Sequence, residues 1–378
     1  EFEAAHPGVT VRSESLPWTS DEQHQFYVVN LEGRRAGIDV MMLDVIWAPE
    51  FARAGWLLDL TSRVAREELA EHFPSTVAPA TWDGHVWALP WNMSAGLLYY
   101  RADLLARHGL RPPATWEELV TQVERIRAAE RDPRLEGHLW QGKQYEGMVV
   151  NVVEALWAEG TELAAGETPF PDPARAAAAL ARLRRSIERG TSPTWVTAAD
   201  EELTRRAFGD GRAIFLRNWP YALDLFEAPA SPVRGRVGIA PLPGIVAGAP
   251  GAGSTGGSHL GIARASAHPD DALALVRFLS GAHAQRAMLA AGFYPTRMPL
   301  YAEPALVRRN PWLPQLHALM LAARPRPITP NYLLLSTTLQ ADFSAVLVGL
   351  RPPAAAIADA RHRLDYFLAA RAAPAARR

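Results

Sequence analysis

Residues 84–119, GHVWALPWNMSAGLLYYRADLLARHGLRPPATWEEL, contain the signals that decide the fold. The run Gly96–Tyr100 is apolar and aromatic without alternation, which predicts a buried strand. Residues 102–108 predict a short helix, and Thr115 with Glu118 forms a capping box that predicts the start of another. A strand that leaves one compact region and leads into the helices of another marks a passage between domains. We therefore expect the first crossing between two lobes here, with a ligand cleft between them.

Length and composition predict two globular domains and argue against several classes of protein. The chain has 378 residues, of which 48% are hydrophobic and 21% charged, more than one ordinary core holds. A net charge of −1 argues against nucleic acid or an anionic membrane as a partner. The lack of cysteine excludes disulfides, thiol catalysis and cysteine metal sites, and Lys143 is the only lysine. No segment reaches the roughly 18 apolar residues of a membrane span.

The order of the predicted elements indicates an α/β fold without an internal repeat. The chain starts with the pattern of a helix end, which we expect a leader segment to have preceded. A strand is predicted at Val9–Ser13 and another at Ile38–Asp44. Two further crossings are expected at Val237–Pro241 and Gly292–Pro295. Residues 244–258 hold six glycines but lack the GxxxxGK[ST] pattern, so we expect a loop and no nucleotide site.

Eight stretches follow one another in the order typical of a known family. On them the chain resembles the extracellular solute-binding proteins of ABC sugar importers, family 1, of the maltose-binding-protein type. Within this group it looks most similar to the trehalose/maltose-binding branch. The stretches are Phe2–Val11, Asp39–Leu60, Gly84–Leu119, Tyr145–Ala155, Phe208–Tyr221, Gly256–Ile262, Pro269–Gln285 and Arg326–Gly349.

The resemblance implies a two-lobed periplasmic-binding-protein fold of type II, with a multi-strand hinge and a ligand cleft. The N-terminal lobe would comprise residues 1–98 and 242–294, and the C-terminal lobe residues 99–241 and 295–378. Such a protein captures a di- or oligosaccharide, here a trehalose/maltose-like α-glucoside, by cleft closure and delivers it to the transmembrane subunits of a permease. It would be a monomer without catalytic residues, cofactor or metal. It would lie outside the cytoplasm, in the periplasm or as a cell-surface lipoprotein.

A sugar site requires flat apolar surfaces for the C–H faces of the ring and planar polar groups for its hydroxyls. Trp219 and Tyr221 match the family's stacking aromatics, and Asp44, at the end of a strand, matches a carboxylate that binds sugar hydroxyls. Tyr100 remains open as an alternative to Tyr99, and Arg324 as an alternative to Arg326. The predicted ligand contacts are Glu14, Asp44, Trp91, Asn92, Tyr99, Tyr145, Glu146, Trp219, Tyr221, Gly257, Ser258 and Arg326.

One residue departs from the trehalose/maltose pattern. The branch commonly has tryptophan after the double glycine, whereas this chain has Ser258. A lost aromatic ring leaves room for a polar substituent, which keeps a glycosyl-glycerol or another modified sugar open as the ligand. A glycoside hydrolase is the other alternative, since Asp44, Glu14 and Glu146 are carboxylates. The sequence shows no strand-end pair of the kind that a hydrolase barrel carries, so a binding protein is favoured.

Overall fold

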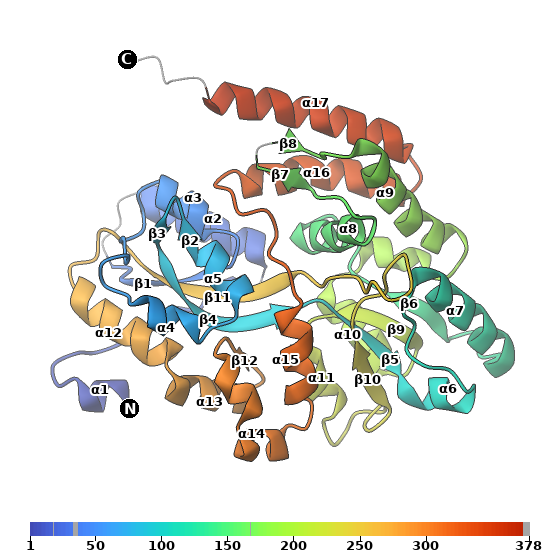
Figure 1. The fold of residues 1–378 in the computed structure, drawn as a ribbon, viewed down its shortest axis with the longest axis horizontal. Helices are drawn as coiled ribbons and strands as arrows, with labels where there is room; N and C mark the ends of the chain where they lie inside the picture. Colours follow the sequence, from blue (N-terminus) through green and yellow to red (C-terminus); the bar gives the residue numbers. More distant parts are fainter. Residues whose placement is uncertain (18, 33–36, 167, 373–378) are drawn as a thin grey trace. The chain divides into compact units, whose positions relative to one another are not determined.

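The computed structural model describes residues 1–17, 19–32, 37–166 and 168–372, which form two compact units (Figure 1). The first unit comprises Glu1–Ala95, Thr255–Leu321 and Ile328–Tyr332. The second unit comprises Gly96–Ser254, Ala322–Pro327 and Leu333–Arg378. The chain therefore passes between the units once after Ala95, once after Ser254, and three times between Leu321 and Leu333.

The two largest differences between these units and the expected lobes concern residues 242–254 and 295–321; residues 96–98 and 328–332 are also assigned to the other unit. Residues 242–254 belong to the second unit, because the return crossing follows Ser254 rather than Val237–Pro241. Residues 295–321 belong to the first unit, so Gly292–Pro295 is not a crossing. In both cases strand pairing decides: Val237–Ala240 pairs inside the second unit, and Tyr294–Pro295 pairs inside the first.

The first unit contains a four-stranded antiparallel sheet in the order β1-β11-β4-β12. Leu60, Leu89, Ile262 and Val276 belong to its buried core, so α12 packs on this sheet. The strands are β1 Val40–Asp44, β4 Ala88–Ala95, β11 Thr255–Ile262 and β12 Tyr294–Pro295, with a hairpin of β2 Thr81–Trp82 and β3 His85–Val86. The helices are α1 Phe2–Ala5, α2 Ser20–Glu32, α3 Ala48–Arg53, α4 Arg66–Ala70, α5 Pro74–Ala80, α12 Pro269–Ser280, α13 Ala282–Ala290, η2 Met298–Ala302, α14 Pro304–Arg309 and α15 Leu313–Leu321.

The second unit contains a four-stranded sheet in the order β10-β5-β9-β6, in which only the β6–β9 pair is parallel. Leu98, Ile214 and Phe215 are fully buried in its core together with Val123 and Ile126 of α7. The strands are β5 Leu97–Arg101, β6 Glu136–Leu139, β9 Ala213–Asn218 and β10 Val237–Ala240, with a hairpin of β7 Ala164–Ala165 and β8 Thr168–Pro169. The helices are α6 Ala102–Arg107, α7 Trp116–Glu130, α8 Glu146–Ala158, α9 Pro173–Glu188, η1 Thr194–Ala198, α10 Glu201–Gly209, α11 Tyr221–Phe226, α16 Tyr332–Leu347 and α17 Pro353–Ala372.

Side-chain caps begin three helices of the second unit. Thr115 accepts a hydrogen bond from the Glu118 amide at 3.1 Å, which confirms the predicted start of α7. The Glu118 carboxylate reaches back to the Ala114 amide at 2.7 Å. Asp172 and Asp200 cap α9 and α10 in the same way.

Two local predictions are wrong. Val9–Ser13 is not a strand: Val11 is exposed, and its amide binds the Glu3 carboxylate at 2.8 Å instead of a neighbouring strand. Residues 255–258, expected to be loop, form the start of β11, because they pair with β4 in spite of their glycines. A segment forms a strand only where another strand pairs with it, and the sequence of the segment alone does not show whether such a partner exists.

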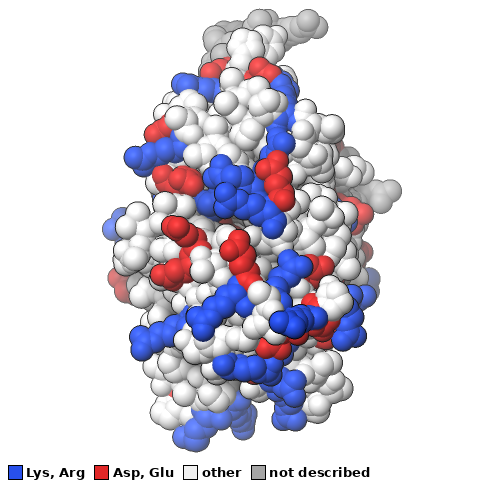
Figure 2. All heavy atoms as spheres, turned by 90° about the vertical axis from the view of Figure 1, so that its right-hand side faces the viewer, with Lys and Arg blue, Asp and Glu red and all other residues white. Residues whose placement is uncertain are grey.

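The described helices include none that is both long and apolar enough to cross a membrane. On the face drawn in Figure 2, Lys and Arg side chains alternate with Asp and Glu side chains and form no large patch of one sign.

Candidate functional site

The first unit brings three predicted contacts together on its sheet. Asp44 at the end of β1 lies opposite Ser258 of β11, and Ser258 lies opposite Asn92 of β4. Residues directly opposite one another on neighbouring strands point to the same face of a sheet. The carboxylate, hydroxyl and amide therefore form one polar row across three strands, and all three residues are partly exposed.

Asp44 is held in place by its neighbours. Its carboxylate accepts a hydrogen bond from Ser20 Oγ at 2.9 Å and another from the Ile46 amide at 3.3 Å. Asp21 lies close by, and its pKa is raised by burial and by the negative charge of Asp44. These contacts fix the orientation of the Asp44 carboxylate at the end of β1.

Gly257 of β11 is required because the backbone of β4 lies close to it at Asn92. Its φ of 106° is one that side chains other than glycine rarely adopt, and a Cβ atom would collide with the Asn92 carbonyl oxygen. The strand register shifts between Ser258 and His259. His259 is fully buried, its Nε2 lies 2.8 Å from the Thr76 carbonyl oxygen, and burial lowers its pKa to about 4.

The remaining two predicted contacts of the first unit lie apart from this row in the sheet. Trp91 packs against the hydrophobic core of the first unit, and its backbone carbonyl accepts a hydrogen bond from Gln285. Glu14 is exposed in the segment between α1 and α2. Neither residue is paired in register with Asp44 or Ser258.

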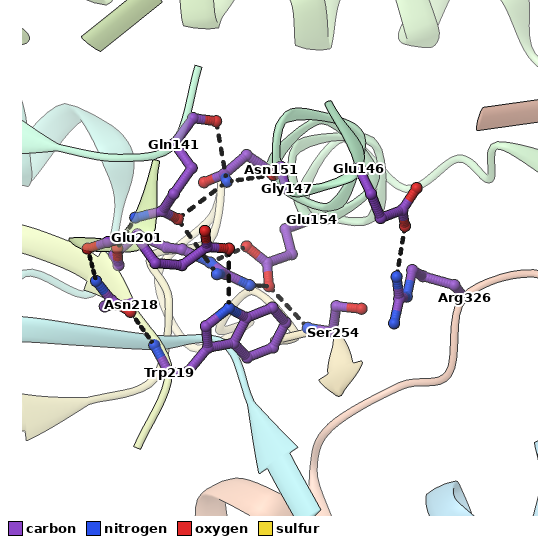
Figure 3. Close-up of polar contacts among 11 residues, drawn as sticks. Gln141, Glu146, Gly147, Asn151, Glu154, Glu201, Asn218, Trp219, Ser254 and Arg326 are labelled. Carbon is purple, nitrogen blue, oxygen red and sulfur yellow. Dashed lines mark hydrogen bonds and ion pairs between the residues drawn. The ribbon is translucent and has the colours of Figure 1, made fainter. Parts of the chain in front are cut away.

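In the second unit, the indole of Trp219 is fixed from several sides (Figure 3). The guanidinium carbon of Arg217 lies 4.1 Å from the centre of the indole ring, a cation–π contact. The indole Nε1 donates to Glu201 at 3.3 Å. The backbone amide of Trp219 donates to Asn218 Oδ1, and its carbonyl accepts from the Tyr99 hydroxyl at 2.8 Å. Trp219 is a half-buried ring with a fixed orientation.

Two tyrosines beside Trp219 are held by carboxylates of α10. The Tyr145 hydroxyl donates to Glu201, and the Tyr221 hydroxyl donates to Glu202 at 2.8 Å. Burial raises the pKa of both tyrosines, and the adjacent carboxylates raise it further, so both hydroxyls stay protonated. The Nζ atom of Lys143 lies 5.8 Å above the Tyr145 ring and 3.5 Å from Asp200.

A buried ion pair lies beneath Trp219. Arg217 donates to both carboxylate oxygens of Glu154, at 2.8 and 2.5 Å, and the side chains are 3% and 5% exposed. Gln141 accepts from Arg217 and donates to the Arg217 carbonyl at 2.9 Å. Asn151 in turn donates to Gln141 and to the Gly147 carbonyl. These residues provide a polar network with paired charges inside the second unit (Figure 3).

Glu146 and Arg326, two predicted contacts, bind each other. Both side chains are buried, and Glu146 also accepts a hydrogen bond from Ser336 at 2.5 Å. Arg324, the alternative to Arg326, is more exposed; it pairs with Glu162 and lies 4.8 Å from the centre of the Trp157 ring.

Tyr99 and Tyr100 both serve the interior of the second unit. Tyr99 is fully buried and packs edge-on against Phe226, with a centroid distance of 5.3 Å. Tyr100 is partly buried against the core of the second unit, and it fills the space beside Gly238. Tyr99 therefore contacts Trp219 by donating a hydrogen bond from its hydroxyl to the Trp219 backbone carbonyl.

Residues 1–286 match the family described as bacterial extracellular solute-binding protein. The chain belongs to this family. Solute-binding proteins of this kind are not enzymes; they bind sugars and deliver them to ABC permeases.

The chain is similar to other proteins over most of its length. A probable ABC transporter-binding protein of Deinococcus radiodurans is 35% identical over 334 residues, which cover 86% of this chain and 78% of the relative. The structure of maltose-bound MalE3 from T. maritima is 36% identical, with a TM-score of 0.86 over 97% of this chain and 94% of that one. A solute-binding protein from Thermotoga lettingae, bound with α-D-tagatose, has a TM-score of 0.81 at 24% identity over 92% and 90% of the two chains. The two-lobed periplasmic-binding-protein fold predicted from sequence is confirmed.

Several residues that shape this solute-binding protein's aromatic cluster were missed in the sequence. Glu201 and Glu202 follow the cap of a short helix, where acidic residues need no functional explanation. Arg217 and Glu154 had a stronger signal, because each is a lone charge in an apolar segment, AIFLRN and MVVNVVEALWA. A lone charge in an apolar segment is expected to be buried with a partner of opposite charge. This rule could have suggested that Arg217 and Glu154 pair with each other. Among the described residues, no group of three or more His, Asp or Glu side chains is placed to hold a metal ion.

Proposed function

We propose that this solute-binding protein captures a di- or oligosaccharide of the trehalose/maltose-like α-glucoside type. The observation that carries the proposal is the fixed indole of Trp219, with Arg217 against one face and Glu201 on its Nε1. A sugar stacks its C–H face on the opposite side of such a ring. Fixing the ring before the ligand arrives reduces the conformational entropy that binding removes.

Carboxylates and hydroxyls beside the aromatic cluster suit a polyhydroxylated ligand. Glu201 and Glu202 already orient the hydroxyls of Tyr145 and Tyr221. On the sheet of the first unit, Asp44 and Asn92 supply further acceptors and donors for sugar hydroxyls. Each hydrogen bond to a charged group contributes about 1.5–3 kcal/mol. The likeness to maltose-bound MalE3, at 36% identity, supports an α-glucoside rather than a sugar alcohol.

A second candidate ligand is a glycosyl-glycerol or another modified sugar. It is favoured by Ser258, which lies between Asp44 and Asn92 in the strand register. A serine there leaves an aromatic platform out of the first unit and adds a third polar group to the row. A ligand with a hydroxylated substituent in place of a second glucose ring matches such a surface.

We further propose that the two lobes close on the sugar to capture it. We also propose that the protein is a monomer, in the periplasm or tethered to the cell surface by a lipid. Because a ligand stabilises the form that it contacts best, sugar should shift an open–closed equilibrium toward the closed form. Small-angle scattering should then show a smaller radius of gyration with sugar. Light scattering should give the mass of one chain.

Isothermal titration calorimetry with trehalose, maltose, sucrose, glucose and a glycosyl-glycerol tests the assignment. We expect micromolar or tighter binding of at least one α-glucoside, with the sugar recovered unchanged after incubation. Preferred binding of the glycosyl-glycerol would select the second candidate. Binding of none of them, together with binding of an unrelated solute, would contradict the proposal.

A further inference from the structure

Two connections of the second unit, the segments at Gly96 and Ser254 where the chain passes to the first unit, lie next to the carboxylate of Glu154. The Ser254 amide, at the last residue of the second unit before β11, donates to Glu154 Oε1 at 2.8 Å. Gly96, the first residue of the second unit after β4, donates its amide to the Ser254 carbonyl at 3.0 Å. Glu154 therefore binds one connection directly and the other through a single hydrogen bond.

Gly96 allows this close approach. A Cβ atom at residue 96 would collide with the Glu154 carboxylate and would lie 2.6 Å from the Arg217 guanidinium. The ion pair consequently packs directly against the backbone of the connection, with no side chain between them. A change in the position of either charge must be accommodated by this backbone.

The other partner of the ion pair lies against the candidate ligand platform. Arg217 uses Nε and Nη2 to bind Glu154, while the same planar guanidinium stacks on the Trp219 ring. A continuous series of contacts then runs from Trp219 through Arg217 and Glu154 to Ser254 and Gly96. All of these residues belong to the second unit.

Helix α8 makes the same kind of contact with a third connection, residues 322–327. Residues 322–327 are the short segment of the second unit between two passages to the first. Glu146, at the start of α8, binds Arg326 of this segment, and the Arg324 amide donates to the Gly253 carbonyl at 3.0 Å. One helix thus carries two buried carboxylates, and each of them holds a connecting segment.

We propose that the Glu154–Arg217 ion pair is a positioning device that couples the Trp219 platform to the connections at Gly96 and Ser254. This inference rests on the proposed function, because it places the sugar on Trp219. A sugar that presses on the ring restrains Arg217, Arg217 restrains Glu154, and Glu154 restrains the two connections. Coupling between sites is reciprocal, so a change in the connections also alters the affinity of the ring for sugar.

Amide hydrogen exchange at Ser254 measures this coupling without any ligand. The full chain is compared with Glu154→Gln, Trp219→Ala and the double variant, as a double-mutant cycle. Glu154→Gln keeps an acceptor but removes its charge, so we expect Ser254 to exchange about tenfold faster. Trp219→Ala should also accelerate exchange at Ser254 in the wild-type background, and by much less in the Glu154→Gln background. Additive effects in the cycle would overturn the inference.

Glu159→Gln is the matched control. Glu159 follows α8 and pairs with Arg182 at 3.1 Å, with side chains 19% and 15% exposed. This variant should leave exchange at Ser254 unchanged. If Glu154→Gln does not fold, Glu154→Leu/Arg217→Met removes both charges together and replaces them with apolar side chains, a change that buried pairs commonly tolerate.

The second arm uses maltose at a saturating concentration. Maltose should slow exchange at Gly96 and Ser254 in the wild-type protein and in Glu159→Gln. In Glu154→Leu/Arg217→Met, which removes the cation–π contact with Trp219, maltose should bind about tenfold more weakly, the size of one partly buried cation–π contact. In neither ion-pair variant should it give such protection. Unchanged protection in a folded ion-pair variant overturns the inference. If no sugar binds the wild-type protein, the proposed function fails, while the ligand-free cycle still decides the coupling.

Discussion

Glu146 and Arg326 form an ion pair whose side chains are only 8% and 3% exposed. Breaking such a pair leaves a buried charge without its partner, which costs about 3–5 kcal/mol. We therefore expect Arg326→Met to lower the free energy of unfolding by about this amount, as measured by urea denaturation. Glu146→Gln combined with Arg326→Met should recover most of the loss. A variant that keeps its stability but binds sugar more weakly would instead identify Arg326 as a direct contact.

Removal of the Trp219 ring should weaken sugar binding without unfolding the protein. Central aromatic contacts contribute about 2 kcal/mol or more to binding, so Trp219→Ala should raise Kd about 30-fold in calorimetry. Trp195→Ala is a matched control, because Trp195 is also half-buried in the second unit and its Nε1 donates to Glu136. Equal affinities for Trp219→Ala and the wild-type protein would remove Trp219 from the site.

Ser258→Ala should separate the two candidate ligands. It removes one hydroxyl from the row formed with Asp44 and Asn92. A lost neutral hydrogen bond costs about 1 kcal/mol, so affinity for a glycosyl-glycerol should fall about fivefold. Affinity for trehalose should change by less than that. If both ligands lose affinity equally, the serine does not determine specificity.

Stability should fall in mild acid because of three buried histidines, His72, His138 and His259, whose pKa values burial lowers. Burial lowers the pKa of His259 to about 4 and that of His72 to about 3, from 6.5 in the unfolded chain. Between these values the unfolded state binds more protons, so the free energy of unfolding decreases as pH falls. The full contribution is present above pH 6.5, and each histidine removes at most about 1.4 kcal/mol per pH unit below it.

Urea denaturation between pH 7.5 and 4.5 measures this slope. His259→Gln should make it shallower, since glutamine does not titrate and its amide still donates to the Thr76 carbonyl. A slope that stays the same in His259→Gln would show that His259 does not titrate as described.

Local signals in the sequence predicted the features that depend on neighbouring residues. The cap at Thr115 and the strand that ends at Asp44 were placed within a residue or two. Each of these depends on side chains and backbone groups only a few positions apart. The family resemblance, carried by eight stretches in order, then supplied the two-lobed fold.

Contacts between distant segments could not be predicted in the same way. Glu146 and Arg326 are 180 residues apart, and each alone resembles a residue exposed for ligand binding. The return crossing was expected at Val237–Pro241, but it follows Ser254. The strand that begins there, at residues 255–258, forms only because it pairs with β4. Register and partner choice are properties of the folded sheet, and a single segment does not contain them.

Lys143 makes the protein suited to optical detection of its ligand. It carries the only side-chain amine in the sequence, its side chain is 49% exposed, and its Nζ lies 5.8 Å above the Tyr145 ring. An amine-reactive fluorophore would therefore label one defined side chain, next to the aromatic cluster, besides any N-terminal amine. Sugar that rearranges Tyr145 or its surroundings would change the emission of the dye, which turns this single lysine into the basis of a reagentless sensor.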